Sequence, residues 1–146
     1  MKRRKFIKSG CNACVALGGG FLISSLASCS PKLSVAKVTQ KDMKFSIAET
    51  EMAETDVKMI TVKNFDYDVF IKKNNDGSFH ALAMICTHAG HSLVKTGNKF
   101  YCSLHGSEFD ISGKVIKGPA ERHLVYLPII NNNGILEVSL LNASSI

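Results

Sequence analysis

The chain has 146 residues, of which 45% are hydrophobic and 21% are charged, with 18 Lys and Arg against 12 Asp and Glu. This length accommodates one domain with a short extension and excludes a large multidomain enzyme. The composition is that of a globular protein and excludes a fully disordered chain.

The net charge of +6 is concentrated at the N-terminus. Residues 1–8 contain five basic residues and no acidic one, whereas the chain after residue 28 has 13 basic and 12 acidic residues. A strongly basic folded face is therefore not expected. Nucleic acid is not predicted as a partner.

The basic run is followed by an uncharged segment, residues 9–30, which glycine and serine interrupt repeatedly. It is too weakly apolar for a membrane-spanning helix, which needs about 20 predominantly apolar residues, and it favours the apolar part of an export signal. The run Arg3-Arg4-Lys5-Phe6-Ile7-Lys8 resembles the twin-arginine signal, which implies export in the folded state. The alternative is an uncleaved helix that anchors the domain.

The signal ends in Leu26-Ala27-Ser28-Cys29, which resembles the lipobox of bacterial lipoproteins. The resemblance implies cleavage before Cys29 and lipidation of that cysteine. We therefore predict an export signal at 1–28, a tether at 29–42 and a folded domain at 43–146. The protein would be exported across the bacterial cytoplasmic membrane and anchored to a membrane by lipid or by the uncleaved helix, facing the periplasm or the outer surface.

From residue 43 onward the sequence consists of short β-prone runs, at 57–62, 67–71 and 79–84. Asn74-Asn75-Asp76-Gly77 predicts a hairpin between the last two runs, and Asn131-Asn132-Asn133-Gly134 predicts another near the C-terminus. No long amphipathic helix is evident. The sequence predicts an all-β domain, a small antiparallel sandwich or barrel.

Two Cys and His pairs each follow a strand-like run, Cys86-Thr87-His88 and Cys102-Ser103-Leu104-His105. Two thiolates and two imidazoles can close on a metal centre. A single structural zinc ion would take all four ligands tetrahedrally. A two-iron cluster would instead place both Cys on one iron and both His on the other.

The extended motifs Cys86-Thr87-His88-Ala89-Gly90-His91 and Cys102-Ser103-Leu104-His105-Gly106-Ser107 strongly resemble the two cluster-binding boxes of the Rieske family. The resemblance covers about residues 55–140. It implies one [2Fe–2S] cluster per chain, with Cys86 and Cys102 on the inner iron and His88 and His105 on the outer one. It also implies that Gly90 and Gly106 bring backbone amides near the sulfurs, and that the Ser107 hydroxyl donates to a cluster sulfide.

The sequence departs from the family pattern at three positions. Quinol-oxidising members have two further cysteines that form a disulfide between the boxes, and here these positions are His91 and Leu104. We expect Leu104 to pack between the loops and His91 to be packed or exposed rather than a ligand, as in ferredoxin-like members. Phe109 replaces a Tyr of high-potential members, which predicts an intermediate potential within roughly −150 to +300 mV. We interpret His80 and His123 as structural or surface residues.

The resemblance implies electron transfer with redox partner proteins, as a small subunit or partner of a larger oxidoreductase, and no catalytic residue is assigned. Three alternatives remain open: the Rieske subunit of a quinol-oxidising cytochrome b-type complex, a ferredoxin that supplies an oxygenase, and a zinc-stabilised binding module.

Overall fold

The computed structural model describes residues 34–36, 38–39 and 43–141. The chain divides into two units, Met1–Pro31 and Lys32–Ile146, and all described elements belong to the second. The predicted export signal, Cys29 and most of the predicted tether lie outside the described residues. Within the described ranges, no helix is long and apolar enough to cross a membrane.

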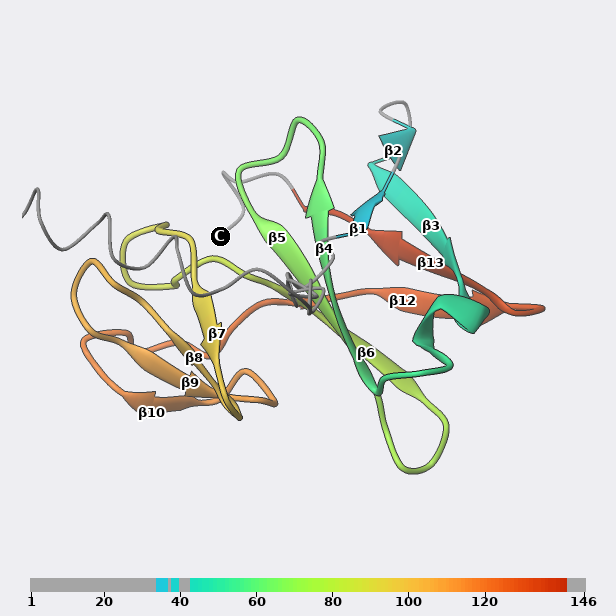
Figure 1. Ribbon diagram of the computed structural model, residues 1–146. Coiled ribbons are helices and arrows are strands. Elements are labelled where there is room, and N and C mark those ends of the chain that lie inside the picture. The colour runs from blue at the N-terminus through green and yellow to red at the C-terminus, as the bar shows by residue number, and fades with distance from the viewer. Residues whose placement is uncertain (1–33, 37, 40–42, 142–146) are drawn as a thin grey trace, which may run out of the picture. The chain divides into compact units, whose positions relative to one another are not determined.

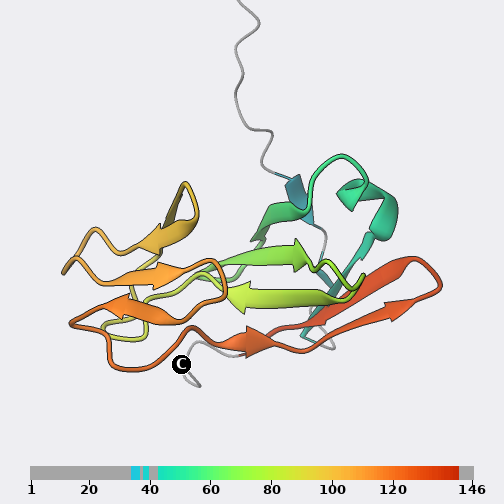
Figure 2. The ribbon, with the colours of Figure 1, turned by 90° about the horizontal axis from the view of Figure 1, so that it is seen from below.

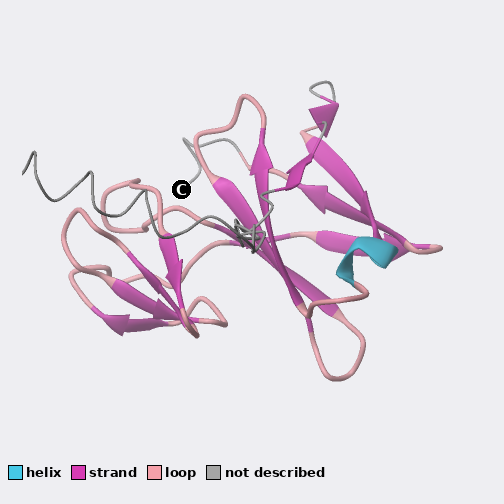
Figure 3. Cartoon of the chain, in the orientation of Figure 1, coloured by secondary structure: helices cyan, strands magenta, loops and turns pink. Residues whose placement is uncertain are grey.

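The regular secondary structure in the described part of the second unit is almost entirely β-strand, as predicted (Figure 3). Its one described helix is a short 3-10 turn, η1 (Glu49–Met52). The thirteen described strands are β1 (Ser34–Ala36), β2 (Val38–Thr39), β3 (Lys44–Ala48), β4 (Val57–Val62), β5 (Asp68–Lys73), β6 (Phe79–Ala83), β7 (Val94–Thr96), β8 (Lys99–Tyr101), β9 (Glu108–Asp110), β10 (Val115–Lys117), β11 (Tyr126–Leu127), β12 (Ile129–Asn132) and β13 (Ile135–Ser139).

The strands form three sheets, in the orders β1-β4-β5-β6-β11, β10-β9-β8-β7 and β12-β13-β3-β2. All described pairs are antiparallel except β1 with β4. Within this unit, Figures 1 and 2 show the β7–β10 sheet at one end, the sheet of β3, β12 and β13 at the other, and β4–β6 between them. The fold is therefore a small antiparallel all-β domain.

Both predicted hairpins are present. Strands β5 and β6 are joined by the turn at 74–77, where Gly77 has φ of 82° and Asp76 Oδ1 accepts the Ser78 amide at 2.9 Å. Strands β12 and β13 are joined by Asn133 and Gly134, with φ of 51° and 82°. Positive φ at both central residues is what a two-residue type I′ turn requires. This turn is shorter than the four-residue stretch predicted, since β12 extends to Asn132.

The interior divides into two apolar clusters, and β5 contributes to both. Because successive side chains of a strand point to opposite faces, Val69 and Ile71 enter one cluster and Phe70 enters the other. The Phe70 ring meets Phe100 of β8 edge to face, with 4.9 Å between centroids. This contact joins the β7–β10 sheet to the central sheet. The second cluster consists of Phe70, Leu82, Met84, Cys86, Leu93, Phe100, Cys102, Phe109, Ala120 and Leu124.

Candidate metal centre

The first loop, residues 86–92, begins three residues after the end of β6, and the buried Met84 and Ile85 lie between them. The Cys86 amide donates to the His91 carbonyl at 2.7 Å, and the Gly90 amide donates to the Cys86 carbonyl at 2.8 Å. An isolated bridge between Ile85 and Ser92 closes the base of the loop. These two backbone hydrogen bonds fold residues 86–91 into a tight turn, because both of them join the end of the segment to Cys86.

The second loop, residues 102–107, follows β8 and repeats this pattern. The Cys102 amide donates to the Ser107 carbonyl at 2.9 Å, and the Gly106 amide donates to the Cys102 carbonyl at 2.9 Å. Each loop therefore has a cysteine at its base and a glycine four positions later that returns the chain to it. The sequence motifs differ in the spacing of the His, but the two backbone turns are built alike.

The glycines in these turns are required by backbone conformation. Gly90 has φ of 63° and Gly106 has φ of 78°, and a Cβ atom added at either position would meet nothing within 4 Å. Side-chain-bearing residues rarely adopt positive φ, whereas glycine does so freely. The amides of both glycines donate to cysteine carbonyls, so backbone amides that approach the cluster sulfurs would come from other residues of the loops.

The candidate sulfur ligands lie inside the domain. Cys86 and Cys102 are each only 1% exposed, and both belong to the second apolar cluster. Neither forms a disulfide. Two thiol groups are thus held in the interior, shortly after β6 and directly after β8, in the same apolar cluster as Phe100 and Phe109.

The candidate nitrogen ligands lie at the surface. His88 and His105 are both exposed, and their Nδ1 atoms are 3.2 Å apart, with 4.9 Å between ring centroids. One ring nitrogen of each residue therefore faces the other across the two loops. The structure brings these two histidines together.

The four candidate ligands are arranged as two pairs, an exposed pair of histidines and a buried pair of cysteines. In the described part of the chain, no three His, Cys, Asp or Glu residues converge on a position for one ion. A [2Fe–2S] cluster of the Rieske type takes two cysteines on one iron and two histidines on the other. The division into a buried and an exposed pair fits that donor set.

Ser107 supplies an independent observation that fits a cluster. Its side chain is completely buried, and its Oγ accepts the Ala120 amide at 3.0 Å. No described residue accepts the hydroxyl hydrogen. Because buried O–H groups are nearly always paired, this hydrogen needs an acceptor, and a cluster sulfide would provide one. Phe109 is also fully buried but has no hydroxyl to donate.

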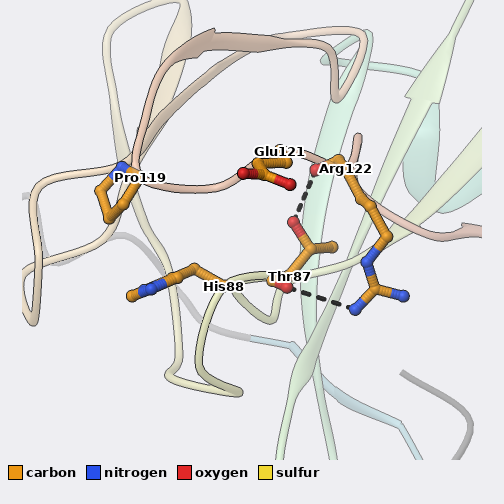
Figure 4. A pocket seen from close by; sticks show the side chains of 5 residues that line it. All are labelled: Thr87, His88, Pro119, Glu121 and Arg122. Carbon is orange, nitrogen blue, oxygen red and sulfur yellow. Dashed lines mark hydrogen bonds between the residues drawn. The ribbon is translucent and has the colours of Figure 1, made fainter.

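A third segment, residues 118–122, is bonded to both loops. It reaches the second loop through the Ala120 amide and Ser107, as above. It reaches the first loop through Thr87, whose Oγ1 donates to the Arg122 carbonyl at 2.6 Å, while Arg122 Nη2 donates to the Thr87 carbonyl at 3.3 Å (Figure 4). Sequence inspection did not identify Thr87 or Arg122, since a contact between residues 35 positions apart leaves no local signal.

A pocket of about 510 Å³ opens beside the exposed histidine of the first loop. Figure 4 shows the His88 ring on one side and Glu121 and Arg122 on the other. The pocket therefore places both charge signs near an imidazole that is a candidate ligand. Its lining residues are Thr87, His88, Pro119, Glu121 and Arg122.

The two residues at the positions of the missing disulfide are both exposed. Leu104 is 50% exposed, so at most about half of its surface can pack between the loops. The His91 ring is exposed, as one of the expected arrangements had it, and its Nε2 lies 3.3 Å from Ser103 Oγ of the second loop.

The remaining histidines lie outside the loops, as predicted. His80 of β6 is half-buried, its Nδ1 is 3.0 Å from Asn74 Oδ1, and burial together with the charge of Lys72 lowers its pKa. His123 is exposed, and its Nδ1 accepts the Val115 amide at 3.2 Å.

A family model described as the Rieske [2Fe-2S] domain matches residues 43–131, more than half of the chain. The chain belongs to the Rieske [2Fe–2S] domain family. Membership implies a [2Fe–2S] cluster and a role in electron transfer, as the sequence predicted. It excludes the alternative of a zinc-stabilised binding module. The match contains both loops and the 118–122 segment.

Known Rieske proteins similar to this one work in different systems. The cytochrome b6-f complex iron-sulfur subunit of Chlorobaculum thiosulfatiphilum is 33% identical over 57 residues, which are 38% of this chain and 32% of that one. The large oxygenase component of the naphthalene 1,2-dioxygenase system of Pseudomonas aeruginosa is 36% identical over 69 residues, 44% of this chain and 15% of that one. The Rieske protein described here thus spans a third or less of the length of these relatives.

Among solved structures, the cyanobacterial plasma membrane Rieske protein PetC3 of Synechocystis PCC 6803 is 27% identical, with a TM-score of 0.51 over 63% of this chain and 94% of that one. The quaternary ammonium Rieske monooxygenase CntA is 21% identical, with a TM-score of 0.50 over 64% of this chain and 31% of that one. The second likeness concerns the fold alone.

Proposed function

We propose that this Rieske protein carries single electrons between a donor and an acceptor at a membrane surface, as the small subunit or partner of a larger oxidoreductase. The observation that carries the proposal is the contrast between the buried cysteines and the exposed His88 and His105 pair. Electrons pass between proteins at the side where a redox centre approaches solvent, which here is the side of the histidines.

The proposed ligands are Cys86 and Cys102 on one iron and His88 and His105 on the other. The [2Fe–2S] cluster supplies reversible one-electron chemistry when bound. The chain's own residues hold the thiolates away from water, present the imidazoles at the surface and offer the Ser107 hydroxyl to a sulfur. The pocket beside His88 gives a partner a recess in which to approach this side.

The proposal includes export and a lipid anchor. Its support is the twin-arginine-like run at residues 3–8 and the lipobox-like motif that ends at Cys29. Cluster proteins that function outside the cytoplasm need an export route for folded chains, because an unfolded chain would expose its free thiols to oxidation. PetC3, a cyanobacterial plasma membrane Rieske protein, resembles this chain over 63% of its residues.

Fractionation of cells that express the full chain tests the anchor. We expect the wild-type protein in the membrane fraction. The Cys29→Ala variant should either appear in a soluble fraction or stay in the membrane with its signal uncleaved. Arg3→Lys with Arg4→Lys should keep the protein in the cytoplasm. An unchanged membrane fraction and unchanged mass for Cys29→Ala would contradict lipidation.

Quinol oxidation in a cytochrome b-type complex is the second candidate. It is favoured by the cytochrome b6-f iron-sulfur subunits among the relatives. His91, Leu104 and Phe109 weigh against it, because they replace residues typical of quinol-oxidising members. Affinity purification of the tagged full chain from solubilised membranes distinguishes the two, since a b-type haem spectrum in the purified complex would favour quinol oxidation.

A further inference from the structure

We propose that the hydrogen bond between His91 and Ser103 ties the two cluster loops together and slows release of the cluster, in the place where other family members have a disulfide. The inference rests on the [2Fe–2S] cluster of the proposed function, but not on any particular donor, acceptor or membrane anchor.

The bond is built into the base of each loop. His91 is fixed by its own backbone, because its carbonyl accepts the Cys86 amide at 2.7 Å. Ser103 directly follows Cys102, whose amide is bonded to Ser107 at 2.9 Å. The side-chain bond, His91 Nε2 to Ser103 Oγ at 3.3 Å, therefore connects backbone positions that are rigidly linked to both candidate sulfur ligands.

Other direct connections between the loops are few. Among the described residues, the only other side-chain contact of this kind from the first loop to the second is that between His88 and His105. The nitrogens of that contact belong to the proposed ligand set, so they cannot serve as a tie that is independent of iron. Leu104 does not substitute, because half of its side chain is exposed to solvent.

Opening of the loops must precede loss of iron, because the thiolates are buried. A bond that exists only while the loops are closed raises the barrier to opening. An exposed neutral hydrogen bond is weak, so we expect its removal to accelerate cluster loss by roughly 2- to 10-fold. The ligands themselves are untouched, and cluster content and reduction potential should stay as in the wild type.

The test measures the rate at which the visible absorption of the oxidised full-length holoprotein disappears in excess EDTA. His91→Ala and Ser103→Ala should each accelerate this loss, and the double variant should be no faster than the faster single variant, because both remove the same bond. Ser103→Thr keeps the hydroxyl and should restore a rate close to wild type. Ser92→Ala is the matched control, since Ser92 is exposed, adjoins His91 and makes no described side-chain hydrogen bond.

Three results would overturn the tie: wild-type rates in both single variants, independent multiplicative effects in the double variant, or equal acceleration by Ser92→Ala. Failure of the proposed function looks different. A wild-type protein without iron would refute the cluster, and a His91→Ala protein that never acquires iron would refute the ligand set.

Discussion

The Nδ1 atoms of His88 and His105 lie 3.2 Å apart at the surface, although 17 positions separate the two residues in the chain. Each histidine belongs to a short turn whose cysteine is buried in the same apolar cluster. Two similar backbone turns, stacked on one core, thus present a pair of nitrogens outward and a pair of sulfurs inward. The function we propose follows from this division.

Replacement of either histidine tests the ligand set. His88→Ala or His105→Ala should abolish the characteristic spectrum of the Rieske cluster, because each removes half of the nitrogen ligands of one iron. Absorption, circular dichroism and iron content of the purified variants provide the measurement. His123→Ala is the control, because His123 is exposed and outside both loops. A variant of His88 with a full wild-type spectrum would contradict the assignment.

Ser107→Ala should lower the reduction potential. The hydroxyl stabilises the extra negative charge of the reduced cluster, and a hydrogen bond to such a group is worth about 1–2 kcal/mol. For a one-electron couple this corresponds to roughly 40–90 mV. The wild-type potential itself should be intermediate, because Phe109 lacks a second hydroxyl. Redox titration measures both values, and a wild-type potential near +300 mV, the upper limit of Rieske centres, would contradict the argument.

Two glycine substitutions distinguish conformational strain from crowding. Gly113 and Gly77 have φ of 84° and 82°, so alanine at either costs about 1–2 kcal/mol. At Gly113 the added Cβ would also lie 3.1 Å from Leu124 Cβ and Leu82 Cδ2, whereas at Gly77 it would meet nothing within 4 Å. Gly113→Ala should therefore lower the midpoint of urea unfolding more than Gly77→Ala does, with unfolding measured by circular dichroism. Equal midpoints for the two variants would contradict this, because they would show that Leu82 and Leu124 can shift to make room for the added Cβ.

His80 predicts a loss of stability in mild acid. Burial and Lys72 lower the pKa of His80 in the folded state, so the unfolded chain binds the proton first, near pH 6.5. Stability should fall as pH drops from about 6.5 through the lower folded pKa, and this contribution should be constant above that window. His80→Gln should lose less stability between pH 7.5 and 5.5 than the wild type, measured by urea unfolding.

The sequence was most informative where a local pattern determines local structure. The Asn-Gly and Asp-Gly turns identified both hairpins, because few residues adopt positive φ. Strands β7, β9 and β10 have three residues each, too few for a periodic pattern, and were not predicted. The paired Cys and His motifs identified the centre, but only the resemblance distinguished a two-iron cluster from zinc.

The tertiary contacts of the loops could not be predicted from the sequence. The exposure of Leu104 and the bond from His91 to Ser103 depend on how two separate turns meet, which neither motif encodes. Similarly, positive φ at Gly90 and Gly106 was foreseeable as a tight turn, whereas the use of their amides by cysteine carbonyls was not.

Electron paramagnetic resonance of the dithionite-reduced full-length protein, combined with metal and sulfide analysis, tests the central claim most directly. The account predicts two irons and two acid-labile sulfides per chain, and a spectrum of the Rieske type that disappears on oxidation. A colourless protein that contains one zinc ion per chain and no iron would contradict it.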